Sequence, residues 1–259
     1  MTTEAFFIPD GENRFIATQN TRGPWAPNAQ HGGPPAALLG RAVEKLSGEG
    51  MLVARCTFDI LRPVPIEPLE VEARVVRPGK KVQLIEASLS ANGEQVMRVA
   101  SWLIRTEALE FETPAIVDSP PPGPEEGEPM DAFKDWDHSY VKSMEWLFVE
   151  GAFFEHGPAT TWFRMRMPLV EGEEPTPLQR VLCAADSASG ISTAIDFNKW
   201  IYINTDLTVY LHRMPVGEWI CIQARTVPER HGVGFTDSVI RDEGGPIGHT
   251  GQSLYIAPR

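Results

Sequence analysis

Residues 57–102 read TFDILRPVPIEPLEVEARVVRPGKKVQLIEASLSANGEQVMRVASW, and this stretch has a counterpart later in the chain. A shift of 151 positions places it without a gap on residues 208–253, which read TVYLHRMPVGEWICIQARTVPERHGVGFTDSVIRDEGGPIGHTGQS. The identical pairs are Thr57/Thr208, Arg62/Arg213, Glu67/Glu218, Ala73/Ala224, Arg74/Arg225, Val76/Val227, Val82/Val233 and Gly93/Gly244. Self-similarity at a fixed offset predicts two copies of one structural module.

Beneath these identities lies an alternation of apolar and polar residues. The apolar positions are Leu69, Val71, Ala73 and Val75 in the first copy and Ile220, Ile222 and Ala224 in the second, where Cys221 is one of the residues between them. A period of two is typical of a strand that turns one face to a core and the other to solvent. We therefore expect a half-buried strand at the same place in both copies.

Each copy then reaches a turn, Asn92-Gly93 in the first and Glu243-Gly244-Gly245 in the second. Asn-Gly suits the positive φ angles of a tight hairpin. A closing strand is expected after each turn, over residues 96–104 and 247–256. Each copy is thus predicted to end in an antiparallel meander.

A helix is expected before each meander. Residues 34–46 open with two prolines, which the first turn of a helix tolerates, and carry almost no polar residue before Arg41. Residues 182–197 are similarly small and apolar. Two helices buried in the concave face of a curved antiparallel sheet give the hotdog arrangement. The predicted fold class is therefore α+β, a double hotdog of two tandem modules that each wrap a central helix.

Residues 119–129, SPPPGPEEGEP, separate the two copies. Proline and acid density of this kind cannot build a core and predicts an extended linker. The expected division is a first hotdog over residues 1–115, a linker over residues 116–140 and a second hotdog over residues 141–259.

Composition limits the classes of partner. With a net charge of −12 and without the extended clustering of Lys and Arg that a nucleic-acid groove needs, the chain is not expected to bind nucleic acid. The three cysteines, Cys56, Cys183 and Cys221, have neither the spacing of metal ligands nor that of a disulfide framework. Neither a signal peptide nor an apolar stretch of the ~18 residues that span a bilayer is visible, so we expect a cytoplasmic protein.

Short motifs lie within this framework: QHGGP at residues 30–34, LTVYLHR at residues 207–213 and GEW at residues 217–219. Together with the tandem meanders they resemble the bacterial acyl-CoA thioesterase II family, and the resemblance covers nearly the whole chain. It implies hydrolysis of fatty-acyl-CoA to free acid and CoA, without a metal or other cofactor, and a place in fatty acid metabolism. It also implies further association into a homo-oligomer.

The resemblance implies which residues hold the attacking water. Asp186 matches the family's aspartate and Gln252 matches its glutamine. The family's usual threonine falls on Asn204, with Thr205 next to it, and an amide at that position can still hydrogen-bond a water. The alternatives are a capping role for Asp186 near a helix N-terminus and a solvent-facing position for Gln252 on its strand.

His31-Gly32-Gly33 offers a place for the oxyanion. Glycines let backbone N–H groups approach a ligand, and the start of a helix concentrates unpaired donors. In related single-hotdog thioesterases such a loop binds the thioester carbonyl from the partner opposite the catalytic acid. The resemblance implies the same across the two halves here. His31 itself is expected to have a structural role and not that of a general base. The alternative is a plain glycine turn before a helix.

Arg77, Lys80 and Lys81 form the one compact basic group, a candidate for contacts with CoA phosphates or a solvated turn. Other functions stay open. A hotdog hydratase usually has an Asp and a His a few residues apart on one helix, and Asp186 has no such histidine. A non-catalytic acyl or acyl-CoA binding module is the main alternative, and a carrier protein could replace CoA in the substrate.

Overall fold

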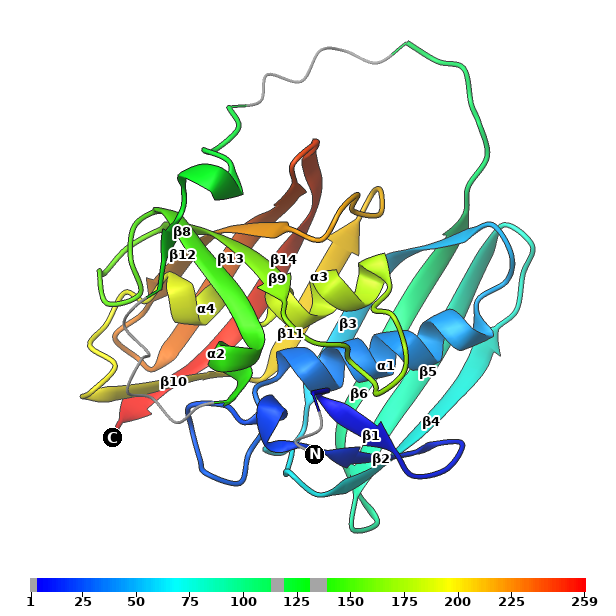
Figure 1. Ribbon diagram of the computed structural model, residues 1–259, viewed down its shortest axis with the longest axis horizontal. Coiled ribbons are helices and arrows are strands. Elements are labelled where there is room, and N and C mark those ends of the chain that lie inside the picture. Colours follow the sequence, from blue (N-terminus) through cyan, green and yellow to red (C-terminus); the bar gives the residue numbers. More distant parts are fainter. Residues whose placement is uncertain (1–3, 113–118, 131–138) are drawn as a thin grey trace.

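The computed structural model describes residues 4–112, 119–130 and 139–259 (Figure 1). Residues 116–118 and 131–138 of the predicted linker therefore lie outside the described residues. Over the described ranges, none of the helices combines the length and the apolar character needed to cross a bilayer.

The described strands form one continuous antiparallel sheet that runs through both halves of the chain (Figure 1). The main strands are β3 (Met51–Ile60), β4 (Pro68–Arg77), β5 (Val82–Ala91) and β6 (Glu94–Arg105) in the first half, and β11 (Asp206–Leu211), β12 (Ile220–Pro228), β13 (Val233–Asp242) and β14 (Gly245–Pro258) in the second. A shift of 151 positions maps β5 onto β13 residue for residue, and it maps β4 and β6 onto β12 and β14 within a few residues. The predicted repeat is therefore confirmed.

The two modules meet where β3 pairs antiparallel with β11 in the middle of the sheet. In this pairing Thr57 lies opposite Thr208, its own counterpart in the repeat. A residue lies opposite its counterpart only at a local twofold axis. The strand order follows the same symmetry, since β6, β5 and β4 continue outward on one side and β14, β13 and β12 on the other.

The predicted hairpins are confirmed in both copies. In the first, Asn92 and Gly93 have φ angles of 52° and 77°, as a tight two-residue turn requires. In the second, Gly245 closes the turn with a φ angle of 120°.

Short elements complete the described chain. The edge strands are β1 (Phe7–Pro9) and β2 (Arg14–Ala17) beside β4, and β9 (Ala159–Met165), β8 (Met144–Glu150) and β7 (Glu128–Pro129) beside β12, while β10 (Trp200–Asn204) pairs with the end of β14. The helical turns are η1 (Gln19–Thr21), η2 (Pro124–Glu126) and α2 (Ser139–Ser143).

Part of the predicted linker packs on the second module. η2 and β7 fall within it, and the Trp162 indole N–H donates to the Pro122 carbonyl oxygen at 2.9 Å. Trp162 lies opposite Cys221 on the neighbouring strand, and both are buried. The expectation that Cys221 faces solvent is therefore wrong, because Trp162 and this segment cover the outward face of the sheet there.

Two helices fill the concave side of the sheet. Helix α1 (Gly33–Leu46) lies against the strands of the first module and is buried over most of its length, as predicted (Figure 1). Helix α3 (Pro177–Ala185) lies against β9 and β12 and packs on α1. Gly40 of α1 is so close to Leu182 of α3 that a side chain at position 40 would overlap it. The helices therefore join the two modules through a tight contact.

The predicted bounds of the second helix, residues 182–197, are wrong. Thr176 and Gln179 form a capping box, with the Thr176 hydroxyl accepting from the Gln179 backbone N–H at 3.2 Å, and Pro177 fills the first helical position. α3 therefore begins five residues earlier than expected. It stops at Ala185, and a short helix α4 (Ala188–Ile191) follows. This break leaves Asp186 at the C-terminal end of α3.

Candidate active site

An apolar cavity of about 320 Å³ lies at the junction of the two modules. The predicted site residues that line it are His31 and Gly32 from the first module and Asp186, Asn204 and Thr205 from the second. Most of the remaining lining is aromatic or aliphatic, including Trp25, Tyr140, Trp146, Phe153, Phe197 and Tyr202. An apolar cavity with a few convergent polar groups is the usual form of a small-molecule site.

Asp186 occupies the C-cap position of α3 and is only 8% exposed. Its Oδ1 atom accepts hydrogen bonds from Asn204 Nδ2 at 2.8 Å and from Gln252 Nε2 at 3.4 Å. A carboxylate removed from water is costly unless such donors are supplied. The alternative that Asp186 caps a helix N-terminus is therefore wrong, because Asp186 ends α3 and its carboxylate accepts from side chains on the paired strands β10 and β14.

The structure distinguishes Asn204 from Thr205. Asn204 Nδ2 donates both to Asp186 and to the Asp206 carbonyl oxygen, at 3.2 Å. The Thr205 hydroxyl lies near the same cavity but donates to the Asp206 carboxylate at 3.2 Å. Asn204 is therefore the residue brought to Asp186, and Thr205 is turned to a different partner.

Gln252 is fully buried on β14, so the alternative of a solvent-facing strand residue is wrong. Its amide nitrogen donates to the Asp186 backbone oxygen at 3.3 Å as well as to the carboxylate. Its amide oxygen accepts from the Ser189 backbone N–H at 3.2 Å. Gln252 thus fixes the break between α3 and α4. Ser189 was not predicted as a site residue. It takes part through its backbone N–H, so its side chain gave no indication of this role in the sequence.

Gly32 and Gly33 approach the second module closely, for different reasons. A Cβ atom on Gly32 would lie 2.7 Å from Asp186 Oδ2, so only glycine leaves room for that carboxylate. A Cβ atom on Gly33 would overlap the Cys183 carbonyl oxygen of α3. The Gly33 N–H donates to His31 Nδ1 at 3.1 Å, whereas the Gly32 N–H has no partner among the described residues. Of the two predicted oxyanion donors, only the Gly32 N–H is thus unengaged.

His31 is packed between the modules. Its ring stacks on Tyr140 with centroids 3.7 Å apart, and its Nδ1 atom lies 3.3 Å from Asp186 Oδ2. Burial lowers the pKa of His31, and the nearby Asp186 carboxylate opposes this shift only in part. The imidazole is therefore neutral at pH 7.

Burial also raises the pKa of the Cys183 thiol, which is consistent with a packing role for Cys183 and not with a nucleophile.

Tyr140 completes this cluster, and its role was missed because it lies in the predicted linker and has no counterpart in the repeat. Its hydroxyl donates to the Cys183 carbonyl oxygen at 2.8 Å and lies 3.0 Å from Ser187 Oγ. Tyr140 therefore links α2 to the end of α3 and holds His31 in place.

The buried neutral His31 should be visible in the pH dependence of stability. The unfolded chain takes up a proton at His31 near pH 6.5, whereas the folded chain does so only at lower pH, because burial lowers the pKa of His31. This contribution to the free energy of unfolding is complete above pH 6.5. Below that pH this stabilisation is lost, by at most about 1.4 kcal/mol per pH unit, until the pKa of His31 in the folded chain is reached.

Urea unfolding of the wild type and of His31→Gln between pH 7.5 and 5.0 measures this pH-dependent loss of stability. We expect a shallower loss in the variant, and equal slopes would contradict the assignment.

The predicted basic group lies elsewhere. These residues, Arg77, Lys80 and Lys81, belong to the hairpin between β4 and β5. This hairpin lies beside the end of β6, where Ile104 is opposite Val82. The next residue, Arg105, donates to the Lys80 carbonyl oxygen at 2.6 Å. Arg105 pairs with Met51, at the start of β3, whereas the cavity adjoins the other end at Ile60. Ten extended residues separate these ends, about 30 Å. The structure does not bring the three cations to the cavity.

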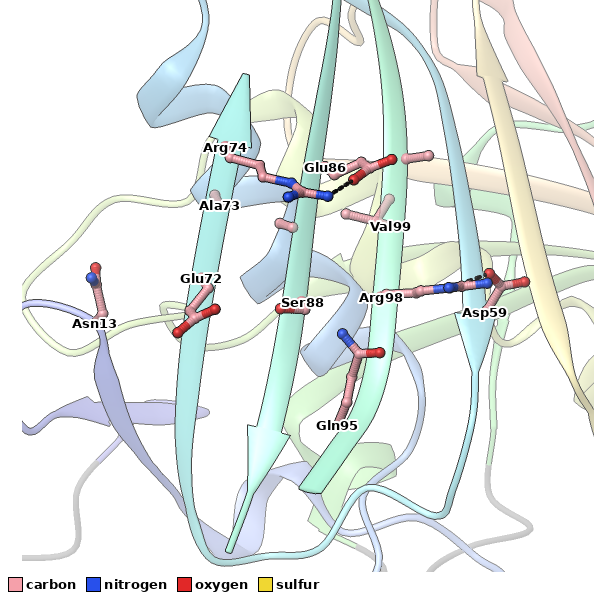
Figure 2. A pocket seen from close by; sticks show the side chains of 12 residues that line it. Asn13, Asp59, Glu72, Ala73, Arg74, Glu86, Ser88, Gln95, Arg98 and Val99 are labelled. Atoms are coloured by element: carbon pink, nitrogen blue, oxygen red, sulfur yellow. Dashed lines mark hydrogen bonds and ion pairs between the residues drawn. The ribbon is translucent and has the colours of Figure 1, made fainter. Parts of the chain in front are cut away.

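A second, larger groove of about 720 Å³ crosses the outer face of the first module (Figure 2). Four of its charged side chains pair across neighbouring strands: Arg74 with Glu86 at 2.9 Å and Arg98 with Asp59 at 2.7 Å. These pairs are exposed, and the repeat places a similar pair, Arg225 with Asp237, in the second module. The groove contains none of the predicted site residues. Exposed ion pairs of this kind are typical of the solvent-facing side of a sheet.

Comparison with solved structures agrees with this architecture. A protein of Thermobifida fusca YX assigned as a thioesterase II superposes with a TM-score of 0.78 at 15% identity, over 98% of this chain and 96% of that one. A hot dog fold protein of unknown function from Alicyclobacillus acidocaldarius gives 0.75 at 16% identity, over 98% and 97%. The acyl-CoA thioesterase II TesB2 from Mycobacterium marinum gives 0.67 at 15% identity, over 98% and 96%. No curated protein sequence matches the chain.

Two modules, each with an antiparallel sheet around a central helix and joined through β3 and β11, define a double hotdog, as predicted. Sequence-family comparison adds the class of activity. Residues 21–104 match the acyl-CoA thioesterase N-terminal domain, and residues 124–256 match the acyl-CoA thioesterase C-terminal domain. The chain belongs to the acyl-CoA thioesterase family.

Proposed function

We propose that this protein hydrolyses acyl-CoA thioesters with a water molecule that Asp186 activates. The observation that carries the proposal is the buried Asp186 carboxylate, which faces the glycine loop of the other module at one apolar cavity. Thioester hydrolysis needs an oriented, deprotonated water and a donor for the oxyanion. The apolar lining suits the acyl chain of a fatty acid, because burying methylene groups there removes them from water.

In the proposed reaction the thioester carbonyl oxygen accepts the unengaged Gly32 N–H. Asp186 takes a proton from water as the water oxygen bonds to the carbonyl carbon, which gives a tetrahedral oxyanion. The carbon–sulfur bond then breaks with its electron pair on sulfur, and the proton held by Asp186 passes to the CoA thiolate. Free acid and CoA are the products.

The surrounding groups suit this cycle. Asn204 and Gln252 donate to the opposite oxygen, Oδ1, and leave Oδ2 for the water. We therefore propose that Gln252 is a positioning residue, since its amide is fully engaged with α3 and α4. Asn204 borders the cavity, and its side-chain oxygen is the acceptor proposed to orient the water.

Steady-state assays with a panel of acyl-CoAs and a thiol-trapping dye test the proposal, because each turnover releases one free thiol. Dye-detected CoA release supports it. Saturable acyl-CoA binding without release would instead favour the non-catalytic binding module and overturn it.

Asn204 and Thr205 form a matched pair of variants in the same assay. Asn204→Ala removes a hydrogen bond to a carboxylate and is expected to lower kcat about 10- to 100-fold. Thr205→Ala is expected to change kcat less than twofold, because its hydroxyl is paired with Asp206. A larger loss in Thr205→Ala than in Asn204→Ala would reverse the assignment.

A further inference from the structure

We propose that Arg259 binds a phosphate of the CoA moiety at the entrance of the active-site cavity. The inference rests on the proposed function, which places the thioester at Asp186 and leaves the phosphates of CoA outside the apolar cavity. The predicted cations Arg77, Lys80 and Lys81 are remote from this entrance, so the polyanionic end of the substrate needs another partner.

Arg259 is held at the cavity by the aromatic residues that line it. Its guanidinium carbon lies 4.4 Å from the centre of the Phe197 ring and 5.6 Å from that of Trp25. Its Nε donates to the Phe197 carbonyl oxygen at 2.8 Å. Trp25 lines the cavity and is 37% exposed, which places the cluster at the opening. A stacked guanidinium is pre-positioned, so little side-chain entropy is lost when an anion binds.

Trp25 comes from the loop before α1, and Phe197 from the segment between α4 and β10. The two rings lie 5.4 Å apart, and Tyr202 lies 5.6 Å from Trp25. Both modules therefore build the platform on which Arg259 rests, just as both build the site around Asp186.

The charge of Arg259 is available to a ligand. Within the described part of the chain its guanidinium pairs with no carboxylate, and of its nitrogens only Nε donates to an acceptor, the Phe197 carbonyl oxygen. Two other cations nearby are engaged: Arg62 lines the cavity and pairs with Glu94 at 3.1 Å, and Lys199 pairs with Asp196 at 3.3 Å. The terminal nitrogens of an arginine match the geometry of phosphate oxygens. In a chain of net charge −12 such a local cation is needed to hold a polyanion.

Arg77 provides a matched control. It is also an exposed arginine stacked on an aromatic ring, 5.7 Å from the centre of Trp102, and it also donates to a backbone oxygen, that of Val82, at 3.1 Å. It differs from Arg259 in lying far from the cavity.

The test compares Arg259→Met, Arg259→Lys and Arg77→Met on two thioesters with the same acyl group. One is the acyl-CoA, and the other is the acyl-N-acetylcysteamine thioester, which lacks phosphates. We expect Arg259→Met to raise KM for acyl-CoA about tenfold, the usual effect of losing one exposed charge-assisted hydrogen bond. It should change kcat/KM for the phosphate-free substrate less than twofold. Arg259→Lys should be intermediate, and Arg77→Met should match the wild type.

An equal loss on both substrates would show that Arg259 only supports the fold of the entrance, and no loss on either would also overturn the proposal. Calorimetric titration of CoA and of pantetheine gives a readout that does not depend on turnover. We expect Arg259→Met to weaken CoA about tenfold and leave pantetheine unchanged. A wild type that binds CoA through Arg259 but hydrolyses neither thioester would refute the proposed hydrolysis alone. Equal CoA affinity in wild type and Arg259→Met would refute the phosphate site alone.

Discussion

Asp186→Asn is expected to lower kcat for acyl-CoA hydrolysis about 1,000-fold or more, the scale of a lost general base. The amide has nearly the shape of the carboxylate, so packing is preserved. Its oxygen can still accept from Asn204 and Gln252. What is lost is the capacity to take a proton from water. Stopped-flow or steady-state measurement of CoA release gives the rate.

Asp206→Asn is the control for this variant. Asp206 is a carboxylate two positions from Asn204, but its side chain accepts from Thr205 and from the Ser253 backbone N–H, and it does not line the cavity. We expect near wild-type kcat from it. A kcat for Asp186→Asn within tenfold of the wild type, with unchanged unfolding, would contradict the role of Asp186.

Gly33→Ala is expected to destabilise the protein by about 3 kcal/mol, which is the upper range for inserting an atom into a packed interior. The added Cβ would overlap the Cys183 carbonyl oxygen, a backbone atom of α3 that no side-chain rotation can move. Since α1 and α3 also touch at Gly40 and Leu182, the helices cannot separate at one end without disturbing the other. Urea unfolding followed by circular dichroism measures the change.

Gly190→Ala is the matched substitution. Gly190 also lies in a helical segment, and a Cβ there would meet only Phe153, at 3.9 Å, an ordinary contact. We expect its free energy of unfolding to stay within about 1 kcal/mol of the wild type. Alanine has the higher helix propensity at both positions, so a similar loss in both variants would contradict the assignment of the effect to the approach of α1 to α3.

The fold was predictable from sequence because its main signals are local. The alternation of residues 69–75, the Asn92-Gly93 turn and the 151-residue offset each act over neighbouring residues or a simple repeat. The pairing of Thr57 with Thr208 follows from such a repeat once the modules associate through β3 and β11. The error on α3 arose where a capping box at Thr176 outweighed the run of small apolar residues from residue 182.

The site was predictable only in part. The resemblance pointed to Asp186, Gln252 and Asn204, whereas the periodicity of the sequence says nothing about side chains 66 positions apart meeting in one hydrogen bond. The stacking of His31 on Tyr140 and of Arg259 on Phe197 depends on how loops fold over the module junction. The density of positive charge along the sequence pointed to Arg77, Lys80 and Lys81, but this density does not indicate how far the three residues lie from the cavity.

A single-turnover reaction in ¹⁸O-water, with enzyme in excess over acyl-CoA, tests most directly whether water attacks the thioester itself. If Asp186 only removes a proton, the released acid carries one ¹⁸O atom and the peptide that contains Asp186 carries none. Appearance of ¹⁸O in the Asp186 carboxylate after one turnover would mean that an Asp186 oxygen had bonded to the acyl carbon and left with the acid, while water attacked the Asp186 carboxyl carbon of the mixed anhydride. Water activation by Asp186 would then have to be abandoned.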